Sequence, residues 1–113
     1  MNASSPLLVA CLCAQWCGTC RDYVPTFEAL GAAVQTLWID IEDDAALVDS
    51  VDVENFPTLL IARGEQLLFF GTITPHAQTL ARLVNSALAG ELPAPLAMPE
   101  VEALVRRLAA RAR

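Results

Sequence analysis

Residues 7–20 read Leu-Leu-Val-Ala-Cys-Leu-Cys-Ala-Gln-Trp-Cys-Gly-Thr-Cys and contain the strongest indication of the fold. The first half of this stretch is a short apolar run, typical of a strand that is covered on both faces. Apolar residues then recur at helical spacing, at Cys17, Cys20, Tyr23, Val24, Phe27, Leu30 and Val34. We therefore expect a buried strand over 7–13 and a long helix over 18–33. Pro25 is expected to kink this helix without ending it.

The middle of the chain predicts further strands. Three apolar runs have the length of strands and lie at 37–41, 58–62 and 67–70. The last two runs are joined by Arg63-Gly64-Glu65, a spacing that favours an antiparallel hairpin with glycine in the turn. Between the first two runs, Asp43 or Asp44 is expected to cap a short helix that extends to residue 48. Residues 51–57 are expected to form a loop.

Two more helices are expected in the C-terminal third. Thr74 is a candidate N-cap with Pro75 in the first turn, and Gly90 is expected to end that helix. Its buried stripe would consist of Ala77, Leu80, Leu83, Val84 and Leu88. Residues 91–99 contain three prolines and predict a stiff linker. A last helix over 100–113 would bury Val101, Leu104, Val105 and Leu108.

Length and charge limit what the protein can be. With 113 residues and 55% apolar content, the chain is expected to form one core. The net charge of −6 and the lack of a basic stripe argue against nucleic acid as a partner. No apolar run approaches the roughly 20 residues of a membrane span, and no cationic leading region precedes the run at 7–14. We therefore expect a soluble, cytoplasmic protein with no membrane partner, in which cysteines are catalytic or metal-binding.

Cys17 and Cys20 are placed for thiol chemistry. They frame the first turn of the predicted helix, where exposed N–H groups and the positive end of the helix dipole favour a thiolate. Two intervening residues allow the sulfurs to form and break a disulfide without moving the fold. The sequence therefore offers a nucleophile and a second cysteine to resolve what the first one captures.

The motifs around this pair resemble the thioredoxin family. They are Trp16-Cys17-Gly18-Thr19-Cys20-Arg21, then Pro25, and then Phe56-Pro57-Thr58 some forty residues after Cys17. The resemblance covers residues 7–89 and implies an α/β fold with a mixed central sheet flanked by helices. Compared with that family, the first strand and helix are missing and a C-terminal helix is added. The expected domain is residues 1–90, with a linker over 91–99 and a helix over 100–113.

The resemblance also implies a function and a site. Cys17 would attack a protein disulfide and Cys20 would release the reduced product, in a protein disulfide reductase that serves electron transfer and cell redox homeostasis. Pro57 would be cis, face the cysteines and leave the backbone of Phe56 to pair with an extended substrate. The substrate-binding residues implied are Trp16, Gly18, Thr19, Phe56, Pro57, Thr58 and Gly71. A reductase would supply electrons, and no cofactor is expected beyond a redox-active Cys17–Cys20 disulfide.

Three residues depart from the family pattern. Cys11 stands where thioredoxins carry a buried aspartate, and Trp38 stands where they carry its lysine partner. A thiol is a poor substitute for a carboxylate in handling protons at neutral pH. Thr19 replaces the proline common between the two cysteines, which favours a less reducing couple.

Several alternatives stay open. The fold could serve as a protein-binding module with weak or no redox activity. Zinc is disfavoured, because strand cysteines two apart such as Cys11 and Cys13 are separated by about 6.6 Å along the chain, whereas sulfurs around zinc are about 4 Å apart. Cys11 and Cys13 are interpreted as small buried hydrophobes. The C-terminal helix could pack on its own domain or on a partner, and the strand at 37–41 could be a sheet edge that supports a homodimer.

Overall fold

The computed structural model describes residues 7–14, 17–30, 34–48, 51, 56–93, 95 and 98–112. Trp16 lies outside these residues, and so does most of the loop predicted over 51–57. The elements are β1 (Leu7–Cys13), α1 (Gly18–Glu28), β2 (Gln35–Asp40), β3 (Thr58–Arg63), β4 (Gln66–Thr72), α2 (Ala77–Leu88) and α3 (Pro99–Ala112). Every strand expected from an apolar run is present, with boundaries that differ by at most two residues.

The strands form one mixed sheet in the order β2-β1-β3-β4. β1 runs parallel to β2 and antiparallel to β3, and β3 and β4 form the predicted antiparallel hairpin. β1 thus has a hydrogen-bonded neighbour on each side, and all seven of its residues are buried. Gly64 has a φ of 61° in the two-residue turn of the hairpin, a conformation that glycine adopts without a steric penalty.

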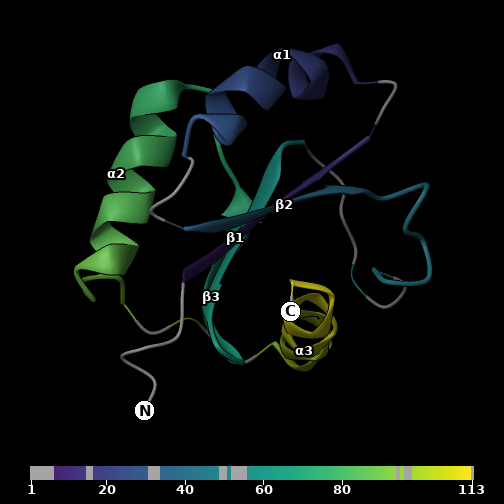
Figure 1. Ribbon diagram of the computed structural model, residues 1–113, viewed down its shortest axis with the longest axis vertical. Coiled ribbons are helices and arrows are strands. Elements are labelled where there is room, and N and C mark those ends of the chain that lie inside the picture. The colour runs from purple at the N-terminus through teal and green to yellow at the C-terminus, as the bar shows by residue number, and fades with distance from the viewer. Residues whose placement is uncertain are drawn as a thin grey trace.

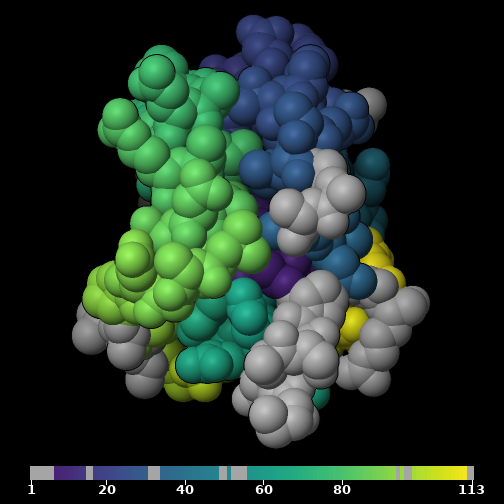
Figure 2. Space-filling view, turned by 60° about the vertical axis from the view of Figure 1, so that its left-hand side comes forward, coloured from purple at the N-terminus to yellow at the C-terminus, as the bar shows by residue number. Residues whose placement is uncertain are grey.

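Helices cover both faces of the sheet. α1 and α2 lie side by side on one face, and α3 lies on the other (Figure 1). Figure 2 shows α1 and α2 next to each other on the face of the sheet that they cover. Because side chains alternate along a strand, Val9 and Cys11 face α1 and α2, whereas Ala10 and Leu12 face the other way, into the cluster that α3 joins. The expected α/β architecture is confirmed.

The expected length of the first helix is wrong. α1 contains Pro25 but ends at Glu28, and the turn at Ala29 and Leu30 follows it. Leu30 and Val34 nevertheless pack against the core on the α1 side. The apolar spacing therefore reported burial correctly beyond the point where the helix stops, because the turn at Leu30 and the residue before β2 also direct their side chains inward.

The short helix predicted to extend to residue 48 does not form. Residues 41–47 form consecutive turns. The capping carboxylate belongs to Asp40, whose Oδ1 accepts hydrogen bonds from the N–H groups of Glu42 (2.8 Å) and Asp43 (3.1 Å). The acidic cap was therefore expected three or four residues too late, because β2 itself ends on the capping residue.

The start of α2 differs as well. His76 occupies the N-cap position without a side-chain cap, and the Thr74 hydroxyl instead lies 3.1 Å from that of Thr79. The buried residues are Leu80, Val84 and Ala87, so the expected burial of Ala77 and Leu88 is wrong. Gly90 ends the helix as predicted, since it has a φ of 73° and the next N–H group bonds back to the Ser86 carbonyl at 2.9 Å.

α3 packs on its own domain. Val101, Leu104, Val105 and Leu108 are at most 5% exposed in the cluster that they share with the sheet. The helix begins at Pro99, the last residue of the segment expected to be linker. Arg107 Nε donates a 2.7 Å hydrogen bond to the Leu47 carbonyl, and Arg111 pairs with Asp44 at 2.9 Å. These contacts tie α3 to the turns that follow β2, so of the two arrangements left open by the sequence the structure has the intramolecular one.

Within the described part of the chain, β2 is an edge strand, as expected. A homodimer through this edge stays a prediction. None of the described helices is long and apolar enough to cross a membrane.

Candidate active site

The site begins where β1 ends and α1 begins. Cys17 is the N-cap of α1, with an extended backbone (φ −86°, ψ 115°) and with its N–H bonded to the Ala14 carbonyl at 3.0 Å. The Cys17 carbonyl accepts a 3.2 Å hydrogen bond from the N–H of Arg21, which closes the first turn. Cys17 is half-buried and is a free thiol. A partly accessible thiol at the positive end of a helix is the arrangement that the sequence predicts for a nucleophile.

Cys20 has a different partner from the one expected. It is 1% exposed and forms a disulfide with Cys13, the last residue of β1, across a Cα–Cα distance of 5.9 Å. The structure thus holds Cys17 and Cys11 as free thiols and contains no Cys17–Cys20 disulfide. The expectation that Cys13 is only a small buried hydrophobe is wrong, because it is bonded to the predicted resolving cysteine.

The direction of the helix explains this pairing. Cys20, Tyr23 and Phe27 are the buried residues of α1 and form a stripe that faces the sheet. Because only a short connection separates β1 from α1, the first turn of the helix lies over the end of the strand. Cys13 is on the same face of β1 as Cys11 and Val9, so its side chain meets Cys20 there.

Cys11 adds a third sulfur atom to those of Cys13 and Cys20 beneath the helix. Its Sγ lies 3.7 Å from the Sγ of Cys13, which corrects the expectation that these two cysteines are too far apart for their sulfurs to meet. The backbone spacing along a strand does not set the sulfur separation, since both side chains point to one face and can lean together. Cys11 is the donor in this contact, because the bonded sulfur of Cys13 carries no hydrogen.

Burial keeps the groups beneath α1 neutral. Desolvation raises the pKa of the Cys11 thiol from 9.0 to about 12. Desolvation, and secondarily the charge of an ionised Cys11, raise the pKa of Tyr23 from 10.0 to about 12. The Tyr23 hydroxyl is buried and has no hydrogen-bond partner among the described residues. Neither group can stand in for a carboxylate base at neutral pH.

The other departures from the family pattern lie nearby. Cys11 pairs in register with Trp38 across β1 and β2. The Trp38 ring lies edge-on to Phe27 of α1, with ring centroids 5.6 Å apart. An apolar contact therefore occupies the place where the resemblance implies a charged one.

Most of the predicted substrate-binding residues gather at the same end of the sheet. The Phe56–Pro57 peptide bond is cis. Thr58 opens β3 opposite Leu12 of β1, and Gly71 of β4 lies opposite Leu59 of β3. Phe56 and Cys17 pack against the same core cluster. Gly18 and Thr19 are exposed in the first turn of α1, so a partner could reach both.

A small pocket adjoins the buried disulfide. It has a volume of about 250 Å³ and is lined by Ala14, Cys20, Arg21, Val24, Trp38, Asp40 and Asp43. Cys20 therefore borders a hollow at the β2 side of α1, although almost none of its surface is exposed.

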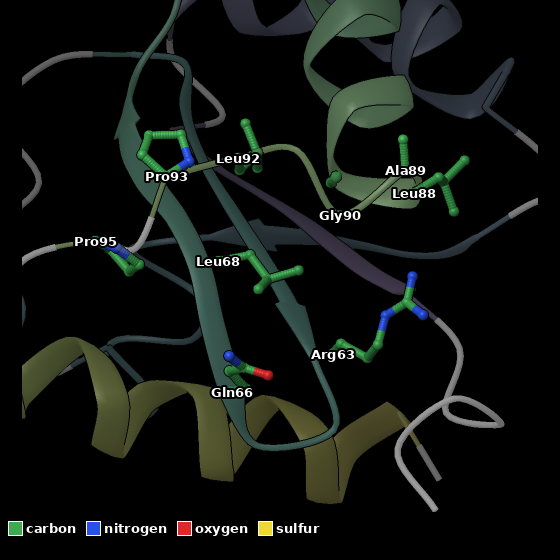
Figure 3. A pocket seen from close by; sticks show the side chains of 10 residues that line it. Arg63, Gln66, Leu68, Leu88, Ala89, Gly90, Leu92, Pro93 and Pro95 are labelled. Carbon is green, nitrogen blue, oxygen red and sulfur yellow. The ribbon is translucent and has the colours of Figure 1, made fainter.

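A larger pocket, of about 430 Å³, lies away from the cysteines. Leu68 of β4, Arg63 of β3, Leu88 at the end of α2 and the segment with Leu92 and Pro93 line it (Figure 3). Arg63 is the one charged residue among its lining residues, and no cysteine lines it. In the described part of the chain, no three His, Cys, Asp or Glu side chains are arranged to hold a metal ion.

Comparison with known proteins identifies the family. A family model for thioredoxin matches residues 1–86, which is most of the chain. The chain belongs to the thioredoxin family. The match includes both cysteines of the first helical turn and the Phe56–Pro57 peptide.

Individual relatives in the thioredoxin family are distant. A thioredoxin of Streptomyces clavuligerus is 28% identical over 71 residues, which are 60% of this chain and 65% of that protein. The chain thus spans less than two thirds of the length of that relative. The germline-specific thioredoxin Deadhead of Drosophila melanogaster superposes with a TM-score of 0.65 at 23% identity, over 74% of this chain and 83% of the other. A thioredoxin f2 solved in complex with ferredoxin:thioredoxin reductase gives a TM-score of 0.65 at 20% identity, over 75% of this chain and 80% of the other. These structural matches show the fold.

Proposed function

We propose that this chain is a thiol-disulfide oxidoreductase that reduces protein disulfides, with Cys17 as the nucleophile and Cys20 as the resolving cysteine. The observation that carries the proposal is the position of Cys17, a free and partly exposed thiol at the N-cap of α1. Partial exposure at the start of the helix leaves the Cys17 sulfur within reach of a substrate disulfide, and the thiolate is the species that attacks.

The reaction is an exchange of sulfur bonds. The Cys17 thiolate attacks one sulfur of the substrate disulfide, forms a mixed disulfide and releases the other substrate sulfur as a thiolate. Cys20, as a free thiolate, then attacks Cys17 Sγ and releases the second substrate thiolate. This second step requires that the Cys13–Cys20 bond of the structure is open. The two electrons reside in the sulfurs, so the proposal includes no cofactor.

The proposed substrate is an extended segment of a protein that lies across Gly18 and Thr19 on α1 and Phe56, Pro57 and Thr58 at the start of β3, with Gly71 at its border. Trp16 is proposed as a further contact on the resemblance alone, since it lies outside the described residues. The proposed electron donor is a reductase, and the fold match to a thioredoxin f2 solved in complex with ferredoxin:thioredoxin reductase supports this choice. Such a cycle runs where cellular reductants keep thiols reduced, so the proposal includes a cytoplasmic location.

Insulin reduction with dithiothreitol as the electron source tests the proposal. The wild-type protein should accelerate precipitation of the insulin chains, and Cys17→Ser should reduce the rate to that of dithiothreitol alone. Cys11→Ala is the matched control, because it removes an equally small thiol that is fully buried. Equal rates for the wild type and Cys17→Ser would contradict the proposal.

One observation favours a second function, that of a protein-binding module. Cys20 is already bonded to Cys13, and the Cys11 thiol offers no base beneath it. A protein held in this state could bind extended segments without turning them over. Insulin reduction separates the two functions, since a binding module would show no turnover in the intact protein.

A further inference from the structure

We infer that Cys13 is a second acceptor for Cys20, so that a disulfide formed between Cys17 and Cys20 moves inward to Cys13 and Cys20 and sets Cys17 free again. This inference deepens the proposed function and rests on it for the first disulfide. It assigns a redox role to a cysteine outside the Cys17-Gly18-Thr19-Cys20 motif.

The geometry places Cys20 between two candidate partners. Cys20 lies one helical turn after Cys17 and is bonded to Cys13, whose Cα is 5.9 Å away, within the range of disulfides. A sulfur can hold only one disulfide partner, so the two pairings exclude each other. Cys20 Sγ is therefore the sulfur common to both pairings, and exchange between them is a change of its partner.

The two pairings differ in burial. Cys13 and Cys20 are each 1% exposed, whereas Cys17 is half-buried. A Cys13–Cys20 disulfide is thus covered by the protein, and large thiols in solution have little access to it. Cys11 lies beside it as a neutral thiol, with its Sγ 3.7 Å from that of Cys13. Once Cys20 has changed its partner from Cys17 to Cys13, the Cys13–Cys20 disulfide should therefore persist.

The transfer balances without any further reagent. After substrate reduction, a thiolate on Cys13 attacks Cys20 Sγ along the Cys17–Cys20 bond. The Cys13–Cys20 bond forms, the Cys17–Cys20 bond breaks, and Cys17 leaves as a thiolate. The proton lost by Cys13 passes to solvent, and no net oxidation or reduction occurs. The oxidant is the substrate disulfide that was reduced earlier.

The consequence is a change in what Cys17 can do. In the inner-disulfide form Cys17 can still attack a disulfide, but Cys20 is no longer free to resolve the adduct. The protein would then hold its target in a stable mixed disulfide. One round of oxidation converts a reductase into a protein that captures disulfides.

An aromatic disulfide counts these steps directly. We would add excess 5,5′-dithiobis(2-nitrobenzoic acid) to the fully reduced, folded protein, and measure thionitrobenzoate released to solution and retained on the protein. Attack by Cys17 on the reagent releases one thionitrobenzoate ion, and attack by Cys20 on the resulting mixed disulfide releases a second. Transfer of the disulfide to Cys13 frees Cys17 for another attack. The wild type should therefore release three thionitrobenzoate ions and retain one thionitrobenzoate group on Cys17. Release of two with none retained by the wild type would overturn the inference.

Two variants provide matched controls. Cys13→Ala removes the inner acceptor and should release two ions and retain none. Cys11→Ala removes a cysteine of the same strand and the same face and should behave like the wild type, with three released and one retained. If Cys11→Ala also releases only two ions and retains none, the effect comes from disturbing the strand, and the inference fails.

Mapping of the disulfide provides a measurement that does not depend on any variant. The wild type, oxidised by one equivalent of the same reagent and alkylated while folded, is then denatured and cleaved with chymotrypsin after Trp16. That cut separates Cys11 and Cys13 from Cys17 and Cys20 in the sequence. Fragments joined through Cys13 and Cys20, with the alkyl group on Cys17, support the transfer, whereas a Cys17–Cys20 link within one fragment refutes it.

The two proposals fail in different ways. If the wild type and Cys13→Ala both reduce insulin but the link maps to Cys17 and Cys20, the transfer is refuted and the reductase stands. If the link maps to Cys13 and Cys20 while neither protein reduces insulin, the transfer stands and the reductase is refuted.

Discussion

Leu104 of α3 tests whether the C-terminal helix is an integral part of the fold. Its side chain is 0% exposed and lies in the cluster on the sheet face opposite α1 and α2. Truncation of a fully buried leucine to alanine costs about 2–5 kcal/mol, through lost apolar contact and the cavity that remains. Leucine and alanine have nearly equal helix propensity, so almost all of the loss reports packing. We expect Leu104→Ala to lower the free energy of unfolding by about 3 kcal/mol.

The expected shift in melting temperature follows from chain length. An unfolding entropy of about 2.1 cal/mol/K per residue gives about 0.24 kcal/mol/K for 113 residues, so about 3 kcal/mol corresponds to about 12 °C. Thermal unfolding followed by circular dichroism, with all proteins kept reduced, measures this shift. Arg106→Ala is the matched control on the exposed face of α3 and should change stability by less than about 0.5 kcal/mol. If both substitutions shift the melting temperature equally little, α3 does not belong to this core.

Three further predictions concern buried and paired groups. Tyr23→Phe should raise the free energy of unfolding by up to about 1 kcal/mol in urea titrations at pH 7, because it removes a buried hydroxyl without a partner among the described residues; a loss of stability would contradict this. Because burial raises the pKa of both Cys11 (from 9.0) and Tyr23 (from 10.0) to about 12, the unfolded chain loses these protons first as pH rises. Stability should be complete below about pH 9 and fall towards pH 12, and Cys11→Ala should flatten this decline in urea midpoints measured across the range. Arg111→Ala should cost less than about 1 kcal/mol, since its ion pair with Asp44 is partly exposed, and the cost should vanish in 1 M salt.

Sequence periodicity was a sound guide to the strands but a poorer one to helix ends. The apolar runs located β1 and β3 because burial on both faces of a sheet demands such runs. The same reasoning extended α1 beyond Glu28, since Leu30 and Val34 continue the apolar spacing although the backbone has already turned. Periodicity reports which side chains are buried, and a turn can bury them as well as a helix can.

The alternatives left open by the sequence were those that depend on contacts between distant segments. Whether α3 packs on its own sheet depends on the fit between its apolar face and the buried residues of β1, β3 and β4 that face it. A linear pattern does not contain this information. The cap before residue 48 was misplaced for a similar reason, because the end of β2 is set by its pairing with β1.

The pairing of Cys13 with Cys20 was accessible in principle from two patterns taken together. Alternation along β1 places Cys11 and Cys13 on one face, and helical spacing places Cys20 and Tyr23 on the face of α1 that meets it. Since the connection between Ala14 and Cys17 is short, the first turn of the helix must cover the last residue of the strand. Considered separately, the strand predicts two small buried residues and the helix predicts a redox pair. Considered together, they predict a third sulfur at the resolving cysteine, and hence chemistry that the Cys17-Gly18-Thr19-Cys20 motif alone does not describe.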